Sequence, residues 1–190
     1  VVNVLTKWGI TPDKVRFIPA PMGVDAWWTR DWGPHAVFTP NGTLHLADAK
    51  YEYATPFTGL ACDDSLNFLY YDDQNQIIKT TKDDHISEFI FQSTGYEILN
   101  LPFAFTGGNV ITDGQRSGFS TCVLTNENRF LGISDEKFFR DVRQLLGIES
   151  HHIISNFEEE GIQHIDCFMK MLDEERLFVM RPPADHPLYE

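Results

Sequence analysis

Residues 134–147 read SDEKFFRDVRQLLG, and strand-like runs lie on both sides of them. The stretch predicts an amphipathic helix, with Ser134 as its N-cap and Gly147 as its stop. The position of this helix between predicted strands decides the fold class. Its apolar face consists of Phe138, Phe139, Val142, Leu145 and Leu146.

The runs around this helix predict a β-β-α-β order. Residues 109–113 and 120–125 are two strand-like runs joined by a glycine-rich turn at 114–118. Residues 151–155 follow the helix and are rich in β-branched side chains, which favour strands. Together these segments predict one ββαβ unit.

The same order occurs earlier in the chain. Residues 35–39 and 43–48 predict a hairpin around the Asn-Gly pair at 41–42, which is a strong turn signal. After a long irregular stretch, residues 83–93 predict a helix and residues 96–101 predict a strand. The repetition predicts an α/β protein built of ββαβ units.

Both ends of the chain carry parts of further units. Residues 163–172 and 176–180 predict the hairpin of a third unit. Residues 1–8 are typical of the end of a helix, and residues 14–19 are typical of a strand. We therefore expect residues 1–190 to be one partial domain, truncated at both ends and cut from a longer repeat protein.

Composition excludes several classes of function. The chain has 190 residues, of which 42% are hydrophobic, so it can bury the core of one domain or most of one. Its net charge of −13 argues against nucleic acid and anionic membrane surfaces as partners. Apolar runs are too short for a transmembrane helix. The N-terminus has no start Met and no basic segment, so it does not resemble a signal peptide, and the compartment stays open.

The three cysteines are Cys62, Cys122 and Cys167. They lack the Cys-x-x-Cys spacing and the nearby His of a zinc site, so we expect no zinc. Because their number is odd, at least one thiol is free or paired elsewhere, and the redox compartment also stays open.

Residues 27–34 read WWTRDWGP and form the first cluster that could carry chemistry. The Gly33-Pro34 pair forces a bend directly after Asp31, which could aim that carboxylate into a cavity. A purely structural interpretation is also open, in which the tryptophans pack in the core and Arg30 pairs with Asp31 at the surface.

Two further clusters follow. Residues 105–109 read FTGGN, and residues 112–114 read TDG. Paired glycines let a ligand approach the backbone closely, but they also occur in ordinary turns. Residues 164–167 read HIDC. In a strand, His164 and Asp166 would lie on the same face. Such a pair suits general acid/base catalysis beside a bound cation. Alternatively, the two residues form an ordinary polar face in contact with solvent.

The three clusters together resemble the Porphyromonas-type peptidyl-arginine deiminase and agmatine deiminase family. The resemblance runs from about residue 28 to residue 180 and rests on the order and spacing of WTRDWGP, GGN with TDG, and HIDC. The Gly-Gly-Asn form with Thr-Asp-Gly is more similar to the peptidyl-arginine branch than to the agmatine branch, which typically has Glu-Gly-Gly.

This resemblance implies the pentein fold, an α/β propeller of five ββαβ units around a central site, of which the chain would hold about three. It implies that Asp31 and Asp166 hold a substrate guanidinium and that His164 is the general acid/base. It also implies substrate-binding roles for Trp28, Arg30, Gly108 and Asn109. Of these, Trp28 would pack against the aliphatic part of the substrate.

The implied reaction needs no metal or organic cofactor. Carboxylates match a planar guanidinium, a thiolate attacks its carbon, ammonia leaves, and hydrolysis gives a ureido group, citrulline in the peptidyl case. The family's nucleophilic cysteine comes from its last blade, so we expect it in a segment beyond Glu190. Cys167 is expected to point away from Asp166, and this chain alone is expected to be inactive.

The expected partners are a cationic guanidine, either peptidyl-arginine or agmatine, and the missing C-terminal segment of the same enzyme. Three alternatives remain open. The enzyme could be an agmatine deiminase, it could transfer the amidino group to another acceptor, or it could be a pentein that binds guanidines without catalysis.

Overall fold

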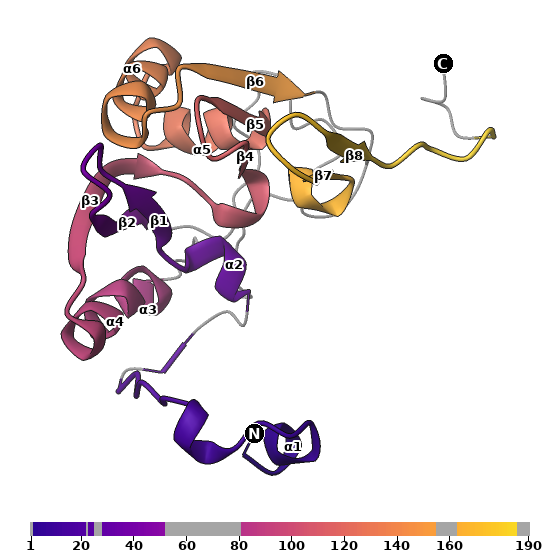
Figure 1. The fold of residues 1–190 in the computed structure, drawn as a ribbon. Coiled ribbons are helices and arrows are strands. Elements are labelled where there is room, and N and C mark those ends of the chain that lie inside the picture. The colour runs from indigo at the N-terminus through magenta and orange to yellow at the C-terminus, as the bar shows by residue number, and fades with distance from the viewer. Residues whose placement is uncertain (1, 22, 25–27, 52–80, 155–162, 186–190) are drawn as a thin grey trace, which may run out of the picture.

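The computed structural model describes residues 2–21, 23–24, 28–51, 81–154 and 163–185. Trp27 and Cys62 lie outside these ranges. Figure 1 shows the described elements. In chain order they are α1 (Val2–Lys7), η1 (Pro12–Lys14), α2 (Thr29–Trp32), β1 (His35–Phe38), β2 (Leu44–Lys50), α3 (Thr81–Asp84), α4 (Ile86–Thr94), β3 (Glu97–Ala104), η2 (Gly107–Asn109), β4 (Ile111–Thr112), β5 (Ser117–Thr121), α5 (Val123–Phe130), α6 (Asp135–Leu146), β6 (Ser150–Ile154), η3 (Ile165–Cys167), β7 (Met169–Met171) and β8 (Leu177–Val179).

The first complete unit is a three-stranded sheet in the order β1-β2-β3. Its hairpin pairs β1 antiparallel to β2, and Gly42 in the connecting turn has a φ of 83°, which favours glycine. After α3 and α4, β3 returns parallel to β2, with Ala47 opposite Leu99. The predicted ββαβ order is therefore confirmed for this unit.

The second unit repeats this topology in the order β4-β5-β6. β4 pairs antiparallel to β5, and β6 returns parallel to β5 after α5 and α6. The return strand was predicted from its β-branched side chains, and it is present as β6. Two sheets with the same strand order confirm a mixed α/β fold built of ββαβ units.

The helix α6 is the element that local sequence determines most completely. Ser134 Oγ accepts a hydrogen bond from Lys137 N at 3.3 Å, and Gly147 closes the other end with a φ of 71°. Phe138 and Val142 on its apolar face have no exposed surface. The predicted helix is therefore confirmed, together with its cap, its stop and its buried face.

One apolar core joins the two units. Phe103 from β3 lies with its ring centroid 5.4 Å from that of Phe138 on α6, and 6.0 Å from that of Phe105. Each fully buried aromatic side chain contributes roughly 1.5–3 kcal/mol of hydrophobic stabilisation. The buried members of this core are Ala47, Leu101, Phe103, Phe105, Val110, Leu124, Phe138, Val142 and Ile148.

The predicted strand at residues 120–125 is present only in part. It is β5, which begins earlier and ends at Thr121, and residues 123–125 belong to α5 instead. Asn128 of α5 donates to the carbonyl of Ala104 and accepts from its N–H, at 2.9 and 3.0 Å. These bonds attach α5 to the end of β3, and Leu124 becomes fully buried.

Two other strand predictions need correction. Residues 163–172 contain the short helix η3 followed by β7, so His164 and Asp166 do not lie on one strand face. Residues 15–19 form no strand, and the preceding turn is η1. A strand needs a neighbour to pair with, and no described strand pairs with residues 15–19. The third hairpin is confirmed as β7 paired antiparallel to β8.

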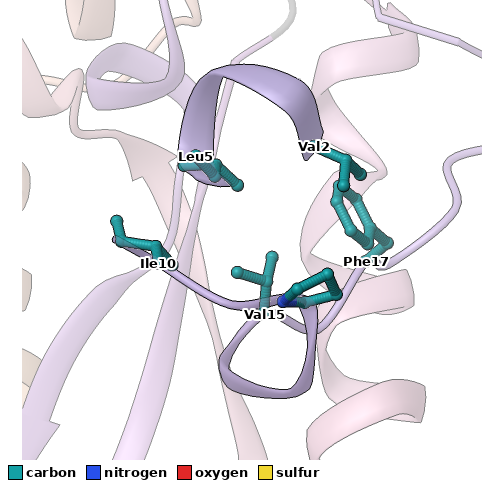
Figure 2. Close-up of a pocket in the computed structure, with 6 residues that line it drawn as sticks. Val2, Leu5, Ile10, Val15 and Phe17 are labelled. Atoms are coloured by element: carbon teal, nitrogen blue, oxygen red, sulfur yellow. The ribbon is translucent and has the colours of Figure 1, made fainter. Parts of the chain in front are cut away.

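The N-terminal segment forms a small apolar cluster of its own. α1, η1 and the chain after them surround a hollow into which Val2, Leu5 and Phe17 project, as Figure 2 shows. It contains none of the residues predicted for catalysis or binding. Across the described ranges, no helix combines the length and the apolar character needed to cross a bilayer.

Candidate active site

Asp31 is placed by the single-turn helix α2. Its N–H donates to the Trp28 carbonyl at 2.9 Å, and the Gly33 N–H closes the turn on the Thr29 carbonyl, also at 2.9 Å. The side chain is 7% exposed, and its Oδ1 accepts the N–H of Gly108 at 3.0 Å. The bend after Asp31 therefore aims its carboxylate inward, onto the glycine pair of η2.

Gly108 is the point at which three candidate side chains meet. A Cβ added to this residue would collide with Asp31 Oδ1, and would lie 2.8 Å from His164 Nδ1 and 3.2 Å from Asp166 Oδ2. A Cβ on Gly107 would collide with the carbonyl oxygen of Arg30. The paired glycines are therefore required for close packing, and they bring together side chains from two distant segments.

His164 is buried between these carboxylates. It is 1% exposed, and its Nδ1 lies 3.4 Å from Asp31 Oδ1. Its Nε2 has no hydrogen-bond partner within the described residues. Asp166 is the second residue of η3 and is partly open to solvent. Its pKa is raised because partial removal from water disfavours the charged carboxylate, and the nearby Asp31 adds to that effect. Two acidic groups and one imidazole thus share a small volume.

Asn109 directly follows the glycine pair, and its Nδ2 has no hydrogen-bond partner within the described residues. It is fully buried, and its Oδ1 accepts from Thr121 N at 3.0 Å, from Thr121 Oγ1 at 2.9 Å and from Ile165 N at 3.1 Å. The side chain therefore ties η2 to β5 and to η3. Asn109 holds the segment that carries His164 and Asp166.

Trp28 and Arg30 lie at the edge of this cluster. Trp28 is 58% exposed and directly precedes α2. Arg30 donates to the Val110 carbonyl at 3.3 Å and lines a cavity of about 570 Å³ bounded by β1, the β4–β5 turn and the end of α6. The lining of that cavity does not include Asp31, His164 or Asp166.

Sequence reasoning missed one acidic residue of the site, Glu127 on α5. Thr106 Oγ1, which directly precedes the glycine pair, donates to both carboxylate oxygens of Glu127, at 3.0 and 3.2 Å. The pKa of Glu127 is raised to about 7, because removal from water and the nearby Asp31 disfavour its charge more strongly than His164 and Thr106 favour it. No local motif marks this residue, because only the packing of α5 brings it here.

The cysteines differ in state and position. Cys122 is disulfide-bonded. Cys167 is an exposed thiol outside any disulfide, and its Sγ lies 3.9 Å from Asp166 Oδ1. The prediction that Cys167 points away from Asp166 is therefore wrong, and the reason is that residues 165–167 form a helical turn instead of a strand.

Metal binding is not supported by the side chains that the structure describes, since they contain no group of three His, Cys, Asp or Glu residues arranged as ligands. The site is a set of carboxyls around one imidazole, with the N–H of Gly108 bound to Asp31. Such a set suits an organic cation with several N–H donors, because each carboxylate accepts hydrogen bonds and carries a negative charge.

Known proteins resemble this chain both in sequence and in fold. A family model for Porphyromonas-type peptidyl-arginine deiminases matches residues 3–190. The agmatine deiminase of Enterococcus faecalis superposes with a TM-score of 0.63 at 20% identity, over 83% of this chain and 40% of that one. A Porphyromonas gingivalis protein described as an arginine deiminase gives 0.64 at 18%, over 97% and 52%. A substrate-bound agmatine deiminase variant of C. jejuni gives 0.59 at 16%, over 92% and 47%.

At these identities the solved structures establish a shared fold. The chain spans about half of their length or less, between 40% and 52%. The family model, in contrast, covers nearly every residue of the chain. This chain therefore belongs to the Porphyromonas-type peptidyl-arginine deiminase family.

Proposed function

We propose that this chain is part of a hydrolase that converts the guanidino group of peptidyl-arginine, or of a related guanidine, to a ureido group with release of ammonia. The observation that supports the proposal most directly is the meeting of Asp31, His164 and Asp166 at Gly108. Membership of the deiminase family is consistent with the same chemistry.

The charges of the site favour a guanidinium. This cation is planar, permanently charged and carries several N–H donors, so two carboxylates can each accept hydrogen bonds from it. Asp31 already uses Oδ1 to accept the Gly108 N–H, which leaves Oδ2 for a ligand. Asp166 has a raised pKa, and a cation beside it would restore its ionised form.

The reaction proceeds in two displacements. A cysteine thiolate adds to the guanidinium carbon, His164 supplies a proton to the departing nitrogen, the C–N bond breaks, and ammonia leaves. The carbon is then bound to sulfur. Water adds to this carbon while His164 accepts a proton, the C–S bond breaks, and the thiolate is regenerated with the ureido product.

We place the nucleophilic cysteine outside these 190 residues. Cys122 is disulfide-bonded, so it offers no thiolate in this state. Cys167 is not in a disulfide, but it lies beside Asp166, and a negative charge there disfavours a thiolate. We also propose that the ββαβ units are arranged around a common axis, as in an incomplete pentein propeller, and that residues 1–190 form part of that catalytic domain.

The test is turnover by the intact protein that contains this chain. Ammonia and ureido product are measured with an arginine-containing peptide and with agmatine. Asp31→Asn and His164→Gln are each expected to lower kcat/KM by roughly 10²–10⁴-fold. Asp185→Asn, an exposed carboxylate outside the cluster, serves as the matched control and should retain full activity.

Two outcomes would contradict parts of this proposal. If Cys167→Ala abolishes turnover by the 190-residue chain, the nucleophile lies within it. If the intact protein binds guanidines with Asp31 and Asp166 but releases neither ammonia nor any amidino-transfer product, it is a binding protein instead.

A further inference from the structure

Glu127 is a partly buried carboxyl that the proposed reaction does not use. Among the described residues, the hydrogen bonds to its carboxylate oxygens come from one neutral hydroxyl, that of Thr106. Taking a carboxylate out of water is costly unless a charge or several hydrogen bonds compensate it. Thr106 is also the residue that leads into Gly107 and Gly108, so Glu127 is attached to the same loop that binds Asp31.

The titratable groups that face Glu127 belong to the site. They are His164, which favours its ionised form, and Asp31, which disfavours it. The nearest cation on its own helix, Arg129, pairs with Asp135 on α6. The protonation of Glu127 is therefore expected to respond to the charges of His164 and Asp31, in addition to its removal from water.

We propose that Glu127 is a third carboxyl of the guanidinium site, which holds a proton while the site is empty and releases it when a guanidinium enters. This inference rests on the proposed function for the identity of the cation, but the assignment of Glu127 to the site stands on contacts within the chain. Three ionised carboxyls beside one imidazole would leave a net negative charge in a partly buried volume, and an entering cation removes that penalty.

The first arm of the test needs no ligand. The carboxyl carbon of Glu127 is followed by ¹³C NMR through a pH titration of the 190-residue chain, with a midpoint expected near 7. His164→Gln should move this midpoint up, because the chain loses the group that favours ionisation. Thr106→Val should also raise it, and Asp31→Asn should lower it.

The second arm measures protons released on binding. Calorimetric titration with agmatine or an arginine amide at pH 7, in two buffers of different ionisation enthalpy, should show release of about half a proton per site. Glu127→Gln should diminish that release, leaving only the contribution of Asp166, and should weaken binding of the ligand. Glu136→Gln, an exposed carboxyl on α6, is the matched control and should behave as the wild type.

The two arms separate the failure of this inference from failure of the proposed function. A Glu127 midpoint near 4.5 that ignores the His164 and Asp31 substitutions would overturn the assignment. Undiminished proton release in Glu127→Gln would do the same, since another group would be its source. If the ligand-free midpoint responds as expected but no guanidine binds, Glu127 is a site carboxyl and the proposed substrate class is wrong.

Discussion

Gly108 is the residue on which the site depends most directly. Asp31, His164 and Asp166 occupy the space that a side chain at this position would need. The N–H of Gly108 also fixes one oxygen of Asp31, so the same residue sets both the distance and the orientation of that carboxylate. Glycine is needed at this position because there is no room for a Cβ. Backbone conformation is not the reason, since Gly108 does not have a positive φ.

We therefore expect Gly108→Ala to lower guanidine affinity by roughly 100-fold, since displacing binding groups by about an ångström has effects of that size. The fold should lose about 1–3 kcal/mol from overpacking. Affinity is measured by calorimetry and the free energy of unfolding by urea titration. Gly132→Ala is the control. Its φ of 75° makes the substitution destabilising, but nothing lies within 4 Å of the added Cβ, so the fold is weakened without displacing a site residue. Equal loss of affinity in both variants would show a general effect of instability.

Glu127 should also make stability depend on pH. Its pKa rises from about 4.5 to about 7 on folding, so the folded state binds more protons between these values, and the free energy of unfolding falls as pH rises through them. The contribution is at most about 3 kcal/mol, and less where water reaches the carboxyl. Glu127→Gln should flatten this slope in urea titrations between pH 4.5 and pH 8, whereas Glu136→Gln should reproduce the wild-type slope.

At the scale of elements, α5 is the helix that brings Glu127 to the site. It is attached to β3 through the side chain of Asn128, which bonds both backbone groups of Ala104. Asn128 also donates to the Leu124 carbonyl of its own helix at 2.9 Å. A buried amide with three such bonds determines where α5 lies.

Asn128→Ala should cost about 3 kcal/mol of unfolding free energy, because it leaves the buried N–H and carbonyl of Ala104 without partners. By comparison, Ser134→Ala removes only the cap of α6 and should cost about 1 kcal/mol. Urea denaturation followed by circular dichroism measures both. A smaller loss for Asn128→Ala than for Ser134→Ala would mean that α5 is held by other contacts.

At the scale of the molecule, the shared core makes the two complete units depend on each other. Phe103 of the first unit packs against Phe138 of the second, and both are fully buried.

Phe103→Ala should therefore lower the free energy of unfolding by about 3–5 kcal/mol. Far-ultraviolet and near-ultraviolet circular dichroism should report one coincident transition. Phe38→Ala, at a side chain that is 67% exposed, should change stability by less than about 0.5 kcal/mol. Two separate transitions would show that the units fold independently.

Local sequence by itself determined the elements whose signals are short-range. The helix at 134–147 has its cap, stop and apolar face within one segment, and the hairpin at 35–48 has its turn residues between its strands. The glycine pair at 107–108 and the bend after Asp31 could likewise be located from residue types, because close packing and chain reversal each demand particular side chains.

Only the tertiary structure decided how these parts meet. Residues 120–125 have strand-like side chains, yet the later ones belong to α5, whose Asn128 bonds to β3. His164 and Asp166 come together with Asp31 through η3, which Asn109 fixes, and a strand's alternating faces play no part. Glu127 reaches the site from a helix whose sequence carries no sign of it. Contacts between residues far apart along the chain depend on the packing of whole elements, and local propensity does not contain that information.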